Sequence, residues 1–172
     1  MIELRNGCIT LEKDYCWVDA WAFESLCNKA EGFWKSGKTE EELNKAVEMS
    51  CKAIALYRGS FFSSLSDEPW TLISRDRLRN KYLNLTGKLA AHWQRCQFMD
   101  RALECYQRCI EEEPIDEEPY FNLMVYYRQL GRREKALAVY TRYRDILSSV
   151  YGIEPSEQIK KLRMSILNDS KS

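Results

Sequence analysis

The chain has 172 residues, with 26 basic and 26 acidic side chains, so its formal net charge is zero. A balanced charge creates no overall field that would draw the protein to nucleic acid or to a membrane surface. No stretch of the sequence approaches the roughly 18 apolar residues of a membrane span, and the first ten residues lack the pattern of a signal peptide. We therefore expect a cytoplasmic protein that is not associated with a membrane.

Seven cysteines are spread along the chain without a CxxC pair, and His92 is the single histidine. This spacing argues against a disulfide framework and against a zinc site, so we expect the cysteines to be small apolar core residues. His92 has no nucleophile motif near it and is predicted to be a packed or surface histidine. Glycine-rich phosphate loops, nucleophile elbows and HExxH motifs are absent from the sequence. We expect no enzyme, no catalytic residue, no metal and no cofactor.

Residues 1–15 contain two short runs of strand-forming residues around Asn6-Gly7. This dipeptide favours a tight hairpin, because both turn positions adopt positive φ. A two-stranded ribbon alone is only marginally stable in water. The hairpin is therefore expected to pack against the helices that follow or against a domain outside this chain.

Residues 16–168 show the apolar periodicity of helices, whereas residues 169–172 are predicted to fray. We expect the first helix to begin with Asp19 as its N-cap and to end at Gly37. The fold class that follows is all-α, built from stacked helical hairpins after the short N-terminal β-hairpin.

The second helix has a clear start signal. Thr39 and Glu42 form the pattern of a capping box, in which each side chain bonds a backbone N–H of the other. We expect this helix to stop at Gly59. In the loop that follows, Phe61 and Phe62 are too apolar for a free linker and are predicted to plug the core.

The helix that starts near Trp70 is predicted to be the longest. Its apolar positions recur in alternating steps of four and three residues, at Leu78, Tyr82, Leu85, Leu89, His92 and Cys96. A coiled coil is an alternative interpretation. The run covers fewer than three heptads and is interrupted by Gly87, so packing within the chain is favoured.

An internal repeat marks the two hairpins that follow. Arg101-Ala102-Leu103-x-x-Tyr106-x-Arg108 recurs as Lys135-Ala136-Leu137-x-x-Tyr140-x-Arg142, at an offset of 34 residues. This offset is the period of the tetratricopeptide repeat. The small residues Ala102 and Ala136 are predicted to let two antiparallel helices approach closely, while Tyr106 and Tyr140 fill the space between the helices.

The turns between these helices carry matching signals. Gly131 is expected to make a tight turn, and Pro114 to stop the helix before it. The second copy departs from the pattern because it has Met124 at the small position and lacks the proline at Ser148. A final helix from Ser156 to Leu167 is predicted to cap the array, with four apolar residues on one side: Ile159, Leu162, Ile166 and Leu167.

Stacked hairpins of this kind expose a concave groove, which the first helix of each repeat lines. The groove positions are predicted to be Asn84, Gly87, Ala91 and Gln94 in the first copy, and Glu118, Phe121, Val125 and Arg128 in the second. Apolar side chains that are partly exposed beside an arginine suit a surface that anchors a peptide or helix. The candidate partner-binding residues are Gln94, Phe121, Val125 and Arg128. Alternatively, other helices of the chain fill the groove.

Charge is distributed less evenly along the chain than its total indicates. Residues 70–96 carry six basic side chains and one acidic, and residues 111–118 carry six acidic ones. Residues 128–144 are basic again. Two interpretations are open: a solvated surface with ion pairs within the chain, or a patterned face for a partner or a second copy of the protein.

Several segments in order resemble the bacterial transcriptional activator domain. This helical repeat domain follows the winged-helix DNA-binding domain in antibiotic-regulatory-type activators, in some response regulators and in large regulators of the maltose-activator kind. The matching segments are 16–24, 55–62, Trp70, Arg75, 113–117, 131–140 and 152–156. Their order and spacing run from about residue 9 to residue 167, so the resemblance covers nearly the whole chain.

The resemblance implies that residues 1–15 are the tail of a winged-helix domain whose DNA-reading helix lies outside this chain. It also implies a signalling or oligomerisation module that acts by protein–protein contact. The partner would be a second copy, another domain of the same regulator, or the transcription machinery. The balanced charge agrees with no direct DNA binding by this chain. A stand-alone tetratricopeptide scaffold or adaptor is the alternative.

Overall fold

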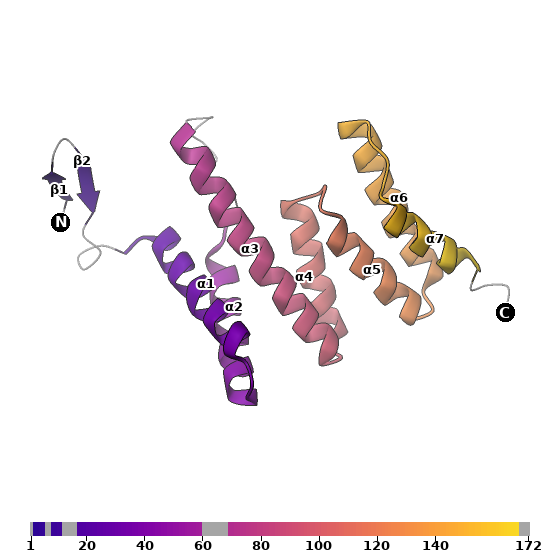
Figure 1. Cartoon of the computed structure of the whole chain (residues 1–172), viewed down its shortest axis with the longest axis horizontal. Coiled ribbons are helices and arrows are strands. Elements are labelled where there is room, and N and C mark those ends of the chain that lie inside the picture. Colours follow the sequence, from indigo (N-terminus) through magenta and orange to yellow (C-terminus); the bar gives the residue numbers. More distant parts are fainter. Residues whose placement is uncertain (1, 6–7, 12–16, 60–68, 169–172) are drawn as a thin grey trace. The chain divides into compact units, whose positions relative to one another are not determined.

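The computed structural model describes the backbone of residues 2–5, 8–11, 17–59 and 69–168, and the side chains of residues 17–59, 69 and 71–168 (Figure 1). From residue 17 onward the described elements are all helical. They are α1 (Asp19–Ser36), α2 (Glu40–Leu56), α3 (Pro69–Arg95), α4 (Met99–Glu112), α5 (Glu117–Gln129), α6 (Arg133–Ile146), the π-helical segment η1 (Leu147–Tyr151) and α7 (Glu157–Asn168). Among the described residues, no helix is both long enough and apolar enough to cross a bilayer.

Two short strands precede the helices. β1 (Ile2–Arg5) pairs antiparallel with β2 (Cys8–Leu11), so that Ile2 lies opposite Leu11 and Arg5 opposite Cys8. The predicted turn at Asn6-Gly7, the predicted core plug at residues 61 and 62 and the predicted frayed tail at 169–172 lie outside the described residues. The chain divides into two compact units, Met1–Leu85 and Thr86–Ser172, which are described in turn.

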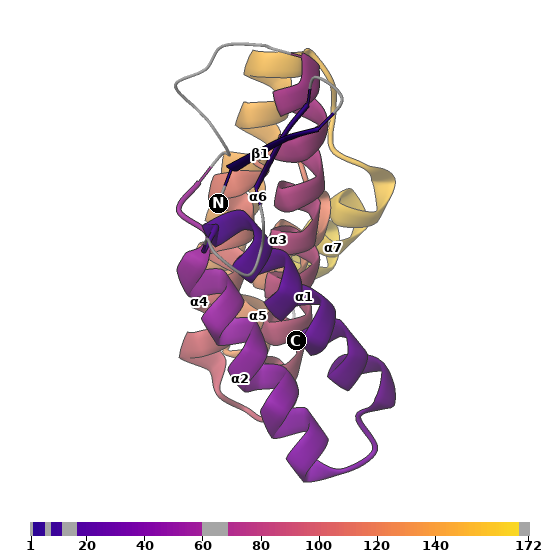
Figure 2. The ribbon, with the colours of Figure 1, turned by 90° about the vertical axis from the view of Figure 1, so that its left-hand side faces the viewer.

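In the first unit α1 and α2 lie side by side as an antiparallel hairpin (Figures 1 and 2). Small residues allow this close approach, because Ala30, Ala46 and Ala53 are fully buried. The one buried polar side chain of α2 is satisfied within this hairpin. Trp34 Nε1 donates to Ser50 Oγ at 3.1 Å, and Ser50 Oγ donates to the Ala46 carbonyl at 2.6 Å. The pair is therefore both closely packed and free of an unsatisfied buried hydroxyl.

The start of α2 confirms the predicted capping box. Glu42 N donates to Thr39 Oγ1 at 3.2 Å, and Thr39 N donates to Glu42 Oε2 at 3.3 Å. The prediction for α1 is wrong by one residue, because Val18 is the N-cap and Asp19 is the first helical residue. The Asp19 carboxylate accepts a hydrogen bond from Ala20 N. As an acidic residue in the first turn, Asp19 still interacts favourably with the positive end of the helix dipole.

The predicted end of α2 at Gly59 is also wrong, because the helix stops at Leu56. Tyr57 leaves the helix in an extended conformation, and its ring stacks on Tyr82 with the ring centres 4.2 Å apart. Phe23 of α1 lies at 5.7 Å from the same ring. Aromatic packing within this unit thus ends the helix before the glycine is reached.

In the second unit the repeat predicted from the sequence is confirmed as two helical hairpins. Ala102 and Ala136 are 3% and 0% exposed, and Tyr106 and Tyr140 are each 5% exposed. Gly131 adopts a positive φ of 67° in the turn between α5 and α6. Both copies therefore use the small and large positions in the predicted way.

A cation–π contact recurs at the same repeat positions. The Arg101 guanidinium lies 4.8 Å from the centre of the Trp93 ring, and the Lys135 ammonium lies 5.8 Å from the centre of the Tyr127 ring. Each cation follows its aromatic partner by eight residues, across the turn of its hairpin. The aromatic rings are half-buried beside the turn of each hairpin, while the cations stay exposed to solvent.

The prediction of buried cysteines holds for only some of them. Cys27, Cys105 and Cys109 are buried, whereas Cys51 and Cys96 are exposed. Cys96 was also predicted to continue the apolar stripe of α3, but the helix ends at Arg95. The stripe itself is confirmed at its centre by four buried residues: Leu78, Tyr82, Leu85 and Leu89.

The final helix α7 packs against α5 and α6, which confirms the predicted helix at this end of the chain. Ile159 and Ile166 are 0% and 1% exposed, and Leu162 and Leu167 are half-buried. Met164, on the opposite side, is 51% exposed. The apolar side of α7 thus belongs to the core of the second unit.

Candidate functional site

The α5 helix carries three of the four candidate partner-binding residues. Phe121, Val125 and Arg128 follow one another by four and three residues, so they share one side of the helix. Phe121 and Val125 are half-buried and Arg128 is exposed. The structure therefore places a partly exposed apolar pair next to an arginine, and the binding of a partner at these residues stays a prediction.

The other side of α5 is held firmly, which gives the exposed side a defined orientation. Tyr120 is fully buried, and its hydroxyl donates to the Pro114 carbonyl at 3.1 Å. Tyr143 of α6 donates to the Ile115 carbonyl at 3.3 Å, and the two tyrosine rings lie 4.5 Å apart. Pro114 thus not only ends α4 but also supplies an anchor for the helix that follows.

Gln94, the fourth candidate, lies on α3 and already forms a hydrogen bond within the hairpin of α3 and α4. Its Oε1 accepts a hydrogen bond of 2.8 Å from the Tyr106 hydroxyl. Burial, and after it the negative charge of Glu118, raise the pKa of Tyr106 to about 12. Tyr106 of α4 therefore joins Gln94 on α3 to α4, so the Oε1 atom of Gln94 is engaged in a contact between these two helices.

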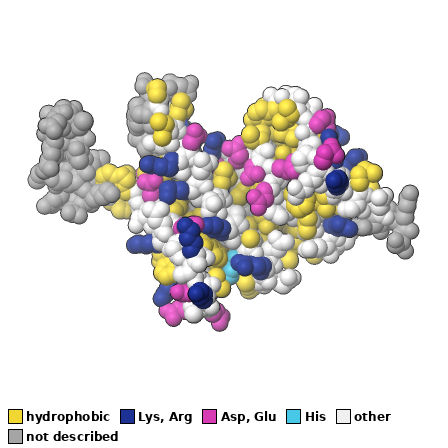
Figure 3. Space-filling model, in the orientation of Figure 1, with side chains coloured by type: hydrophobic (Ala, Val, Ile, Leu, Met, Phe, Trp, Pro, Cys, Tyr) yellow, Lys and Arg dark blue, Asp and Glu magenta, His cyan; other side chains and the backbone are white. Residues whose placement is uncertain are grey.

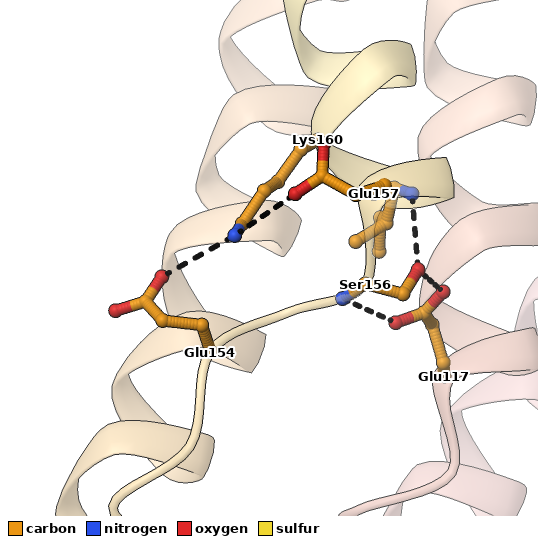
Figure 4. A network of polar contacts seen from close by, with 6 residues as sticks. Glu117, Glu154, Ser156, Glu157 and Lys160 are labelled. Carbon is orange, nitrogen blue, oxygen red and sulfur yellow. Dashed lines mark hydrogen bonds and ion pairs between the residues drawn. The ribbon is translucent and has the colours of Figure 1, made fainter.

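A network of polar contacts fastens the start of α7 to α5 (Figure 4). Ser156 donates to Glu117 twice, from its backbone N at 3.2 Å to Oε2 and from its hydroxyl to Oε1. The same hydroxyl accepts from Ile159 N at 3.4 Å and so caps α7. At the far end of α7, Arg133 of α6 donates to the Leu167 carbonyl at 3.1 Å. Both ends of α7 are thus tied to other helices.

We expect Ser156→Ala to lower the free energy of unfolding by about 1–2 kcal/mol, because it removes both the cap of α7 and the side-chain bond to Glu117. Urea denaturation monitored by circular dichroism measures this change. Ser165→Ala is the matched control, since the Ser165 hydroxyl bonds only the Leu162 carbonyl within α7. Equal effects of the two substitutions would contradict a special role of the Ser156–Glu117 contact.

Sequence reasoning missed an exposed apolar patch at the end of η1 and just after it. Val150, Tyr151 and Ile153 are 66%, 52% and 54% exposed, on either side of Gly152. Figure 3 shows hydrophobic side chains gathered at this end of α6. The available signal was the run Val150-Tyr151-Gly152-Ile153, but the exposure of its side chains is visible only in the structure.

The first unit contains an open pocket of about 420 Å³, lined by asparagine and charged side chains together with Cys27 and Leu85. Its cations are already engaged, because Arg77 pairs with Glu24 at 3.2 Å and Lys81 bonds Asn28 at 2.8 Å. Burial raises the pKa of the Cys27 thiol in its wall to about 11. At neutral pH this thiol stays protonated, and a protonated thiol is a poor nucleophile.

His92 is half-buried on α3, beside the Trp93 ring. Burial lowers its pKa, and the nearby charge of Arg95 lowers it further, so the imidazole is largely neutral at pH 7. This is a packed histidine of the kind predicted from the sequence.

The geometry of the helices defines the class of protein. Paired antiparallel helices with small residues at their close contacts, repeated at 34 residues, form a tetratricopeptide-like helical repeat. A family model described as the bacterial transcriptional activator domain matches residues 18–167. The chain belongs to this family of regulator domains, as the resemblance of its sequence segments implied.

Two solved structures are similar in fold. Mycobacterium tuberculosis EmbR, in complex with a low-affinity phosphopeptide, matches with a TM-score of 0.68 and 18% identity. The match covers 98% of this chain but 43% of EmbR, so the chain spans less than half of that protein. The C-terminal tetratricopeptide-containing domain of a putative FK506-binding protein of Plasmodium falciparum matches with a TM-score of 0.58 and 15% identity, over 91% of this chain and 95% of that domain. No curated protein sequence matches.

Proposed function

We propose that this chain is the protein-interaction or oligomerisation module of a bacterial transcriptional regulator, and that another part of the regulator recognises DNA. The observation that carries the proposal is the family match, which spans almost the whole helical part of the chain. The 43% coverage of EmbR supports the second half, because it leaves room for further domains in a regulator of this kind. The zero net charge agrees with a module that does not itself bind DNA.

The exposed side of α5 is the proposed contact surface. Phe121 and Val125 offer apolar area that is only partly covered, and Arg128 can donate directed hydrogen bonds at its edge. Such a combination is typical of the few residues that contribute most of the binding energy in an interface. The tyrosine anchors on the opposite side keep this surface rigid, which reduces the entropy lost on binding.

A stand-alone adaptor is the second candidate function. It is favoured by the likeness to the tetratricopeptide-containing domain of the Plasmodium protein, which this chain matches over almost all of that domain. An adaptor would bind its partner without any DNA-binding domain in the same polypeptide. The regulator is preferred because the family model is specific to transcriptional activators.

The test is the double substitution Phe121→Ala and Arg128→Ala in the full-length regulator. Transcription from the promoter beside the regulator's own gene is expected to fall by about tenfold or more. The reason is that loss of two side chains that contribute most of the binding energy costs about 2 kcal/mol or more in binding. The affinity of the regulator for that DNA, measured by gel shift, is expected to stay unchanged. Val139→Ala with Arg142→Ala, on α6, is the matched control and should leave transcription unaltered.

Two results would contradict the proposal. If the thermal midpoint of the Phe121→Ala, Arg128→Ala variant falls by several degrees, these side chains belong to the core and not to a contact surface. If the affinity for DNA falls together with transcription, the surface contributes to DNA binding and the division of labour between domains is wrong.

A further inference from the structure

The two turns at either end of α5 carry opposite charge. The turn between α4 and α5, with the first residues of α5, contains six acidic side chains in residues 111–118. The turn between α5 and α6, with the first residues of α6, contains Arg132, Arg133 and Lys135 against Glu134. We name these the acidic end and the basic end. Figure 3 shows acidic side chains gathered where α4 meets α5.

The two ends cannot neutralise each other within one molecule. They are separated by the whole of α5, whose 13 residues span about 20 Å, and Figure 1 shows the two turns at opposite ends of this helix. Elsewhere, charges are paired locally: Lys45 contacts Glu41, and Lys52 contacts Glu48, each at 2.6 Å. Among the described residues, Glu111 and Glu118 at the acidic end and Arg132 and Lys135 at the basic end form no such ion pair, and all four are exposed.

Each end also presents one exposed apolar residue. Ile115 lies in the acidic turn and is 40% exposed, and Leu130 lies in the basic turn and is 44% exposed. An apolar contact surrounded by charged side chains is the usual arrangement of a specific protein interface. Because the charges around the two residues have opposite sign, the two ends are complementary both in charge and in apolar character.

The start of α6 adds a further feature to the basic end. Arg132 is the N-cap residue, and its side chain makes no capping hydrogen bond. The first N–H groups of α6 therefore lack the acceptor that Asp116 provides for α5, where it accepts from Glu118 N at 3.2 Å. A carboxylate from another molecule is the kind of group that these N–H groups and the positive end of the helix dipole favour.

We propose that the acidic end of one copy of this chain docks on the basic end of the next, with Ile115 against Leu130 and the acidic side chains facing Arg132 and Lys135. The inference rests on the proposed function and names a second copy as the partner. Such a contact joins two different surfaces, so each copy keeps one free end and further copies can add in the same direction. The association is screened by salt.

Sedimentation velocity of the 172-residue chain tests the proposal with two charge-reversed variants. The first variant carries Arg132→Glu with Lys135→Glu, and the second carries Glu111→Lys with Glu118→Lys. The wild-type chain should sediment faster as its concentration rises, and less so in high salt. Each variant alone should lose association by about tenfold or more, because the basic end of the first variant becomes acidic and the acidic end of the second loses most of its net negative charge. An equimolar mixture of the variants should associate again, since the unchanged acidic end of the first variant can dock on the unchanged basic end of the second.

The control exchanges a charge pair in the first unit, Glu41→Lys with Lys45→Glu, which keeps the net charge and should associate like the wild type. Thermal midpoints from circular dichroism show that each variant is folded. If a charge-reversed variant is unstable, a variant with Glu111→Gln and Glu118→Gln is used in its place. With all other residues unchanged, it should associate more weakly than the wild type.

A wild-type chain that stays monomeric at low salt and high concentration would overturn the proposal, and so would a mixture that fails to associate. Either result leaves the proposed function standing if the regulator still depends on the α5 surface for transcription. Conversely, transcription that does not respond to Phe121→Ala and Arg128→Ala would count against the proposed function while the salt-dependent association persists.

Discussion

Replacing Ile159 by alanine is expected to lower the free energy of unfolding by about 2–5 kcal/mol, the usual cost of removing a large aliphatic side chain from a closed core. Ile159 is 0% exposed, so no solvent can fill the space that the substitution leaves. It lies on α7, which packs against both α5 and α6. Loss of this side chain should therefore loosen the array at its C-terminal end.

Thermal denaturation followed by circular dichroism measures the effect. A chain of 172 residues loses about 2–4 °C of its thermal midpoint for each kcal/mol, so a fall of at least about 4 °C is expected. Met164→Ala is the control on the same helix, because Met164 is 51% exposed and its truncation should change stability by less than about 0.5 kcal/mol. Similar midpoints for the two variants would show that α7 does not complete the core.

The substitution Ala136→Leu should destabilise the protein by about 1–3 kcal/mol, because a larger side chain at a closed helix contact forces the helices apart. Ala136 is 0% exposed and stands at the small-residue position of the second repeat. Leucine is nearly as good a helix former as alanine, so helix propensity cannot explain a loss of this size.

Ala138→Leu, two residues further along α6, isolates the packing effect. Ala138 is exposed, and the same change there should leave the midpoint of urea denaturation nearly unaltered. If both substitutions are tolerated equally, α5 and α6 are not in close contact at Ala136, and the tetratricopeptide interpretation of this position fails.

Local signals predicted several elements correctly because their cause is contained in a few neighbouring residues. The capping box of Thr39 and Glu42 is one example, since each partner lies three residues from the other. The positive φ of Gly131 is another, because glycine adopts this conformation without a steric cost. For the candidate partner-binding residues, the phase of the repeat predicted the partial exposure of Phe121 and Val125 on α5.

Helix ends were harder to predict because neighbouring elements compete with local preference. α2 stops at Leu56 and not at Gly59, and Tyr57, which leaves the helix in an extended conformation, stacks on Tyr82. The exposure of Cys96 has a similar origin: the heptad-like spacing continued in the sequence, but α3 ended first. The spacing of apolar residues along one helix does not predict which other helix covers them.

The sequence by itself determined that this protein is a helical repeat, because a 34-residue period with alternating small and large residues has only one economical way to pack. The ordered segments also led to the right family, which residues 18–167 match. Only the tertiary structure decided how α7 is fastened, since Ser156 and Glu117 are 39 residues apart and nothing in their local sequence relates them. It likewise decided that Ile115 is exposed among acidic side chains and Leu130 beside basic ones. The exposure of a side chain depends on which helices pack over it and not on its own chemistry.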